Sequence, residues 1–338
     1  MSESRSLLLE TAERLFAGLS DTAPFTSSWR EVATAGLPSL LVAENRDGFG
    51  GDWGDAFAVL RCAGSHAAPL PVGEAIVAAR LAADAGLELD AGLATIASRA
   101  AGEVDAKGRF AGHIASVPWG REPAQVVFDL GEQIVCAKTA DARSIERRSS
   151  PAGEARDTLI FEGAAVQCAE RRMSVLEAGA FVRGAQIAGA LDATLALSIQ
   201  HANQRIQFGK PIGTFQAVQQ SLAVFTEEAA AVNCAGQAAA EATDRGDAGF
   251  EIAAAKLRAN MAAAVGVATA HQVHGAIGFT QEHTLHRFTR RLITWRSEFG
   301  SERFWAEQIG RGVCGRGADA LWPFLTARGD TGLRGRSK

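Results

Sequence analysis

Apolar residues recur every three to four positions over most of the chain, which predicts a mainly α-helical protein. In the N-terminal region the apolar face of the first expected helix comprises Leu7, Leu8, Ala12, Leu15 and Phe16. Further helices are expected at 29–35, 55–65 and 74–85. The pattern strengthens after residue 174, with runs at 174–204, 214–245, 248–274 and 301–312. Long helices joined by short links form up-down bundles, so we expect a C-terminal four-helix bundle.

The pattern differs in the middle of the chain. Short runs rich in β-branched and aromatic residues lie at 110–117, 125–129, 133–137, 158–161 and 165–168. These runs predict a small β domain of five to seven strands, with a loop at 147–154. We therefore expect an N-terminal helical domain (1–104), a reduced β domain (105–172), a C-terminal helical bundle (173–328) and a flexible tail (329–338).

Composition narrows the class of protein. The chain is 47% hydrophobic and 21% charged, as in ordinary globular proteins, and abundant alanine favours closely packed helices. The net charge of −4 and the pI near 6.0 provide no basic field for nucleic acid or an anionic membrane. Apolar runs stop short of the ~20 residues that span a bilayer. With no signal-peptide pattern in residues 1–10, we expect a cytoplasmic protein.

Cysteine and histidine positions give little sign of a metal centre. The five cysteines are Cys62, Cys136, Cys168, Cys234 and Cys314, and none belongs to a CxxC pair, so we expect free thiols in a reducing compartment. The histidines with metal-like i,i+3 spacing are His271, His274, His283 and His286. No carboxylate or cysteine set completes them and a glycine turn separates the two pairs, so we expect satisfied surface histidines and no metal site.

Two segments at expected helix ends carry candidate ligand contacts. The first is 205–213 (RIQFGKPIG), followed by Phe215 and Gln216. It places a guanidinium where a long helix ends, and its fork geometry suits a phosphate. The second is 272–280 (QVHGAIGFT), in which glycine lets the backbone approach an anionic group. On spacing alone, each segment also fits an ordinary helix end with solvated side chains.

Together the two segments resemble the acyl-CoA dehydrogenase family, which typically shows R-x-Q-F-G-x-P-I-x-x-F-Q and, roughly sixty residues later, Q-x-x-G-G-x-G-F. The segments 29–36, 40–44, 48–51 and 67–71 are similar to the family's N-terminal W-x-x-L-A-x-x-G, V-P-E-x-x-G-G-x-G and A-P-L-P sequence. The resemblance covers residues 5–90 and 170–312 and implies the fold of that family and an FAD cofactor.

The resemblance also assigns roles to positions. The cofactor-binding residues that it implies are Arg205, Phe208, Gln216, Gln272, Gly275, Ala276 and Gly278. In the family, the arginine and the glutamine of the second motif contact the ADP half of an FAD held mainly by the neighbouring subunit. The glycine turn packs against the same dinucleotide, and here its second glycine is replaced by Ala276.

The family reaction, α,β-dehydrogenation of an acyl-CoA, needs a carboxylate within reach of the α proton. The resemblance places this base at Phe299 or, in some members, at Gly179, and neither side chain can accept a proton. Glu177 is close to the second position but is expected to be a charge at a helix N-terminus. Glu298, one residue from Phe299, is the remaining candidate for the base, and a one-residue gap would be needed to bring it into place.

The β domain departs further from the family. The T-E-P-x-x-G-S-D loop and the W-I-x-x-G strand that cradle the flavin ring are missing, and the chain reads VPWGR at 117–121. Trp119 is either a remnant that stacks on flavin or a core or interface tryptophan. A basic run comprises Arg287, Arg290, Arg291 and Arg296. We expect it either to meet CoA phosphates or partner carboxylates, or to form a solvated or interface face.

A chain with the ADP-side motifs but without base or flavin cradle resembles the short, degenerate subunit of heteromeric acyl-CoA dehydrogenases from bacterial steroid degradation. The resemblance implies a longer partner subunit that bears the glutamate, an α2β2 assembly, a steroid side-chain acyl-CoA as substrate, and electron-transfer flavoprotein as acceptor. Two alternatives remain open: a self-sufficient homomeric dehydrogenase that uses Glu298, and a flavin-free structural homologue.

Overall fold

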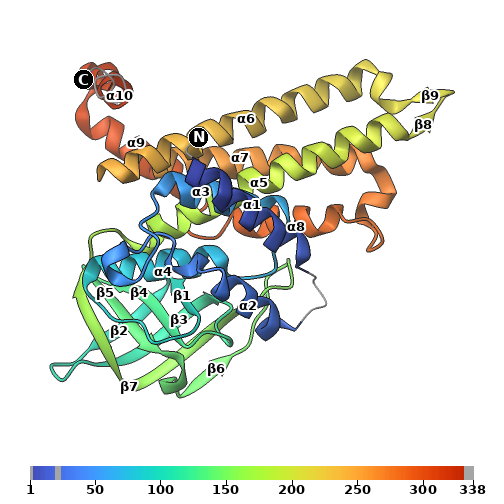
Figure 1. Cartoon of the computed structure of the whole chain (residues 1–338). Helices are drawn as coiled ribbons and strands as arrows, with labels where there is room; N and C mark the ends of the chain where they lie inside the picture. Colours follow the sequence, from blue (N-terminus) through green and yellow to red (C-terminus); the bar gives the residue numbers. More distant parts are fainter. Residues whose placement is uncertain (1–2, 20–23, 331–338) are drawn as a thin grey trace.

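The computed structural model describes residues 3–19 and 24–330, and it places a seven-stranded sheet below a set of long helices (Figure 1). The N-terminal helices are α1 (Glu3–Gly18), α2 (Phe25–Thr34), α3 (Trp53–Ser65) and α4 (Val72–Ala85). The C-terminal helices are α5 (Val175–Gln204), α6 (Gln216–Arg245), α7 (Gly249–His274), α8 (Leu285–Trp295), α9 (Glu302–Arg316) and α10 (Leu321–Asp330). The three long helices begin and end within two residues of their expected bounds.

The sheet has the strand order β1-β4-β5-β7-β3-β2, and β6 pairs with β7. Its strands are β1 (Ala94–Ala97), β2 (Ala100–Val104), β3 (Arg109–Pro118), β4 (Gln125–Leu130), β5 (Gln133–Lys138), β6 (Ser144–Glu146) and β7 (Arg156–Glu170). β1 runs parallel to β4, and every other pair in this sheet is antiparallel. A separate two-stranded hairpin, β8 (Ile206–Gln207) and β9 (Lys210–Pro211), follows α5.

Two expectations about the sheet were wrong. The sheet begins at Ala94 instead of residue 105, because the alanine-containing β1 is buried throughout and shows no alternation of apolar and polar residues. The runs 158–161 and 165–168 belong to one strand, β7. Gly163, with a φ of +82°, forms a bulge opposite the Phe110–Ala111 step that keeps the strand continuous. The expected tail lies outside the described residues from 331 onward, and residues 329–330 end α10.

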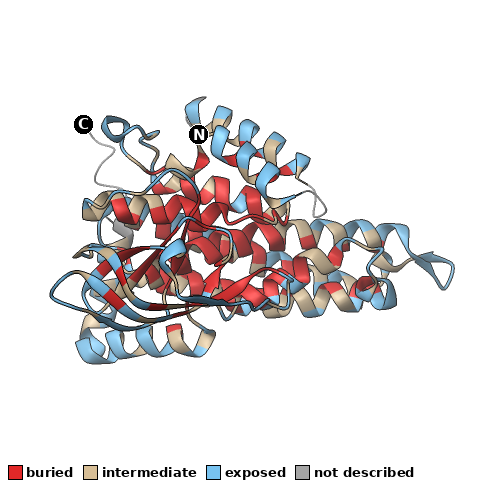
Figure 2. Ribbon diagram, turned by 90° about the horizontal axis from the view of Figure 1, so that it is seen from below, coloured by how far each residue is buried: buried red, intermediate tan, exposed pale blue. Residues whose placement is uncertain are grey.

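Helix α5 lies at the centre of the molecule, in contact with α3, α6, α7 and α8. The Ser174 hydroxyl accepts from the Glu177 backbone N–H, and the Glu177 carboxylate accepts from the Ser174 backbone N–H, which forms a capping box. This confirms Glu177 as a helix N-terminal charge. Buried residues gather where the helices cross the sheet, and the hairpin end of the bundle is exposed (Figure 2). In the described part of the chain, no helix is both long enough and apolar enough to cross a membrane.

Helices α3 and α5 meet backbone to backbone through glycine. A Cβ atom on Gly189 would lie 1.8 Å from the carbonyl oxygen of Arg61, and one on Gly64 would lie 2.1 Å from that of Gln186. These contacts are too short for any side chain. The two glycines therefore set the distance between the N-terminal domain and the bundle.

We predict that Gly189→Ala destabilises the protein by about 2 kcal/mol or more, because the obstructing atom belongs to a helix backbone that cannot move independently. The matched control is Gly184→Ala in the same helix, where the added Cβ meets no atom within 4 Å. The control should be neutral or more stable by up to about 1 kcal/mol, since alanine favours helix. Urea unfolding measures the free energy of unfolding of both variants. Equal changes in the two variants would contradict the close approach of α3 and α5 at Gly189.

Candidate functional site

The two motif segments lie at the same end of the bundle. The first ends α5 and forms the β8–β9 hairpin, and the second ends α7 and continues into a short 3₁₀ helix, Gly275–Phe279. Figure 1 shows the hairpin projecting from this end. His201 on α5 stacks on His274 on α7, with ring centroids 4.6 Å apart, so the segments are neighbours although roughly seventy residues separate them.

Most of the expected cofactor-binding residues are exposed at this end. Exposed residues of this set are Arg205, Phe208, Gln216, Gln272, Gly275 and Ala276, whereas Gly278 is buried. Phe208 is 92% exposed and Phe279 is 72% exposed, which is unusual for phenylalanine and is typical of a surface that a partner covers. A Cβ at Gly275 would meet nothing within 4 Å, so the space over the turn is open. The exposed guanidinium of Arg205 and the open glycine turn thus lie at the same end of the bundle.

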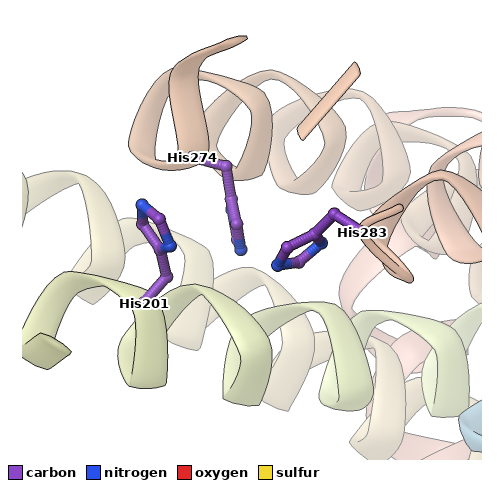
Figure 3. Close-up of side chains that lie close together, drawn as sticks. All are labelled: His201, His274 and His283. Atoms are coloured by element: carbon purple, nitrogen blue, oxygen red, sulfur yellow. The ribbon is translucent and has the colours of Figure 1, made fainter. Parts of the chain in front are cut away.

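His274 is not the satisfied surface group that we expected, whereas His283 and His286 are half-buried and each has a hydrogen-bond partner. His274 is 5% exposed, its Nδ1 donates to the Ala270 carbonyl at 2.8 Å, and its Nε2 has no partner among the described residues. Figure 3 shows the His274 ring lying between His201 and His283. His201 was missed because no local spacing connects it to the other two. Burial lowers the pKa of His201 and of His274, and nearby histidines lower both further, so both imidazoles are neutral near pH 7.

A second candidate site is a cavity of about 320 Å³ between the sheet and the bundle. Residues around it include Ser98, Ser116, Arg156, Thr294, Glu298 and Phe299. Glu298 is the only acidic side chain that lines this cavity in the described structure. If this cavity holds substrate, Glu298 is the side chain of the cavity that would have to act as the base.

Glu298 belongs to a buried chain of ion pairs with alternating charge. Its carboxylate accepts from Arg156 Nε at 2.5 Å and from Arg183 Nε at 2.7 Å. Arg183 continues to Glu74 at 2.5 Å. Arg156 continues to Glu154 at 2.9 Å, and Glu154 pairs with Arg291 at 2.8 Å. The chain joins α4, α5, β7, α8 and the turn before α9.

This ion-pair chain makes Glu298 a weak base. Burial raises the pKa of its carboxyl group, but the charges and hydrogen bonds of Arg183 and Arg156 outweigh burial and bring the pKa to about 2. A general base works best with a pKa near the working pH. Both of its oxygens also accept hydrogen bonds from guanidinium groups, so Glu298 is poorly suited to proton abstraction.

The two positions that the resemblance gives for the base lie against each other. A Cβ on Gly179 would be 2.1 Å from the Phe299 ring, so the phenyl group occupies the space that a side chain at 179 would need. Phe299 has a φ of +50°, which is unusual for a residue other than glycine. Lys256 supports this turn, since its Nζ donates to the carbonyls of Trp295 at 3.0 Å and Gly300 at 3.3 Å. Burial lowers the pKa of Lys256 to about 7.

Trp119 is half-buried, and in the basic run Arg291 is buried whereas Arg290 is exposed. The ring centroids of Trp119 and Phe25 are 5.3 Å apart, so the tryptophan packs the sheet against α2. Arg291 is 6% exposed and pairs with Glu154. Arg290 donates to the Pro151 carbonyl at 2.6 Å, and Arg296 pairs with Glu302. Arg290 and Arg291 therefore connect α8 to the segment before β7, and Arg296 connects the end of α8 to the start of α9.

Comparison with known proteins agrees with this architecture. Residues 169–314 match the family described as acyl-CoA dehydrogenase, C-terminal domain. The chain is 27% identical over 310 residues to acyl-CoA dehydrogenase IpdE2 of Mycobacterium tuberculosis, with 86% of this chain and 91% of IpdE2 covered. The fold is that of an acyl-CoA dehydrogenase. Over residues 169–314 the chain is similar to the C-terminal domain of acyl-CoA dehydrogenases, and over most of its length it is similar to IpdE2.

Two solved structures have a similar fold. One is a chain of the Tcur3481-Tcur3483 steroid ACAD G363A variant, with a TM-score of 0.82, 23% identity, and 93% of this chain and 98% of that chain covered. The other is a chain of the ChsE4-ChsE5 complex from Mycobacterium tuberculosis, with a TM-score of 0.80, 21% identity and the same coverage.

We predict that Glu298→Gln destabilises the protein by about 3–5 kcal/mol, because it leaves two buried guanidinium groups without their shared carboxylate. The folded-state pKa lies below the unfolded value of about 4.3, so the stabilisation is complete above that pH and is lost as the pH falls toward 2. In the Glu298→Gln variant, the free energy of unfolding should therefore no longer fall with this titration as the pH is lowered. Urea unfolding at pH 7 and at several lower pH values measures it.

The matched control is Glu307→Gln on α9, whose carboxylate is 45% exposed and pairs with Arg303. A surface pair of this kind contributes at most about 1 kcal/mol. If Glu298→Gln were no more destabilising than the control, the ion-pair chain would not hold Glu298 as described.

Proposed function

We propose that this chain is a subunit of an FAD-dependent acyl-CoA dehydrogenase that needs a longer partner subunit for catalysis. The chain contributes ADP-side contacts through Arg205, Gln272 and the turn Gly275–Phe279. The partner supplies the glutamate base and the cradle for the flavin ring. The observation that supports this division most directly is the contact of Phe299 with Gly179, because both positions expected for the base lie together and neither has a carboxylate.

The residues of this chain suit binding and orientation more than proton transfer. In the assembled enzyme, FAD would accept the hydride that leaves the β carbon of the acyl group. The Arg205 guanidinium would hold the dinucleotide's phosphate charge, and the open Gly275 turn would admit its backbone. Phe208 and Phe279 would be covered by the partner. Glu298 would stay bound to its two arginines during turnover, so the α proton would leave to a carboxylate of the partner.

The relatives support a heteromeric assembly and a large acyl group. One similar structure is a complex of two named proteins, ChsE4 and ChsE5, and another is described as a steroid ACAD. We infer an α2β2 assembly, a steroid side-chain acyl-CoA as substrate and electron-transfer flavoprotein as acceptor. The last two inferences rest on family resemblance.

The visible absorbance spectrum distinguishes this proposal from its alternatives. The protein purified alone should be colourless. Co-purified with the longer acyl-CoA dehydrogenase subunit encoded nearby, it should give a yellow complex that acyl-CoA bleaches. A lone protein that is yellow and bleached by acyl-CoA would favour the self-sufficient enzyme instead. A colourless complex with every candidate partner would favour the flavin-free homologue.

In the yellow complex, we predict that Arg205→Ala weakens FAD binding by about tenfold or more, because one charge-assisted contact to phosphate is lost. The control is Arg303→Ala, whose guanidinium is 89% exposed on α9, and which should leave FAD affinity unchanged. FAD released after gel filtration measures both variants, and equal retention would place Arg205 away from the cofactor.

A further inference from the structure

We propose that His201, His274 and His283 form a binding site for a zinc-class divalent ion at the exposed end of the bundle. The three side chains come from α5, from α7 and from the turn before α8. This inference is independent of the cofactor and the partner proposed above, because it rests on these three side chains alone.

The geometry is close to that of a three-histidine site. One ring nitrogen from each residue lies within 4.8 Å of the others. Tetrahedral zinc with Zn–N bonds of about 2.0–2.1 Å places its nitrogen ligands about 3.4 Å apart, so the ring nitrogens must move closer by up to about 1.4 Å. His201 and His283 are only half-buried, and their rings can turn toward His274 (Figure 3).

His274 is held as a metal ligand would be. Its Nδ1 donates to the Ala270 carbonyl at 2.8 Å, which leaves the lone pair on Nε2. Histidines that bind metals usually make this kind of hydrogen bond through the other ring nitrogen. The residue is 5% exposed and its Nε2 has no partner in the described structure, which is uncommon for a buried polar atom. A bound cation would satisfy it.

The donor set selects the class of ion. Three neutral imidazoles suit zinc, cobalt or nickel, whereas magnesium and calcium prefer oxygen ligands. A fourth position would remain for water. His283 Nδ1 now accepts from the Leu285 backbone N–H at 3.1 Å. Coordination through Nε2 would move the proton to Nδ1 and exchange this hydrogen bond for the metal bond, so the first turn of α8 would adjust.

A bound ion would cross-link the ends of α5 and α7, which carry the two exposed motif segments. His201 precedes Arg205 by one helical turn, and His274 directly precedes Gly275 and lies two residues after Gln272. Cross-linking α5, α7 and the start of α8 would stabilise this end of the bundle without contacting the ion-pair chain between the sheet and the bundle.

The test is calorimetric titration of the metal-free full-length protein with ZnCl2, with CoCl2 absorbance as a second probe. We expect one Zn²⁺ per chain and a cobalt spectrum typical of nitrogen and oxygen ligands. His201→Gln and His283→Gln should each weaken binding by at least about 100-fold, since one of three ligands is lost. Because both side chains are only half-buried, we expect both variants to fold, and circular dichroism checks this.

The control is His113→Gln, an exposed histidine on β3 that should leave zinc affinity unchanged. A second group of metal-binding type, Glu13, Cys62 and His66, lies elsewhere in the described structure with Cys62 buried, and His66→Gln tests it. The proposal is overturned if the wild type binds no zinc. It is also overturned if His66→Gln abolishes binding while His201→Gln does not, or if cobalt shows thiolate charge-transfer absorption from Cys62.

Discussion

The molecule depends on one buried chain of six charges. Its members, in order, are Glu74, Arg183, Glu298, Arg156, Glu154 and Arg291. Removing a charge from water costs several kcal/mol, and a buried ion is tolerated only when its partners are in place. Because these residues come from different elements, each pair fixes one element relative to the next. These ion pairs therefore position the sheet against the bundle, and they engage the one carboxylate that lines the cavity among the described residues.

Because of these ion pairs, the two candidate sites of the protein differ in their chemistry. Between the sheet and the bundle, the arginines hold Glu298 ionised, and the Phe299 ring lies against Gly179, so the cavity has no free carboxylate in the described structure. At the far end of the bundle, the helix termini expose a guanidinium, an open glycine turn and two phenylalanines. A fold can keep its architecture while its sites diverge, because packing and site chemistry depend on different residues.

The sequence predicted the fold well where a regular pattern was long. The long helices α5, α6 and α7 have strong periodicity and clear ends, and their bounds were correct to within two residues. β1 was missed because a short buried strand without alternation has no pattern of its own. Motif spacing led to Arg205 and Gln272, which the structure places at one end of the bundle. Arg183, Lys256 and His201 were missed because their partners are distant in sequence, and only the fold brings them together.

The most direct test of the central claim is the FAD content of the purified heteromeric complex, combined with anaerobic titration by acyl-CoA. If this chain shares a cofactor and supplies no base, the complex should contain one FAD for each pair of different chains, and acyl-CoA should reduce all of it. Two reducible flavins for each such pair would mean that the cavity beside Glu298 is catalytic, and would contradict the account.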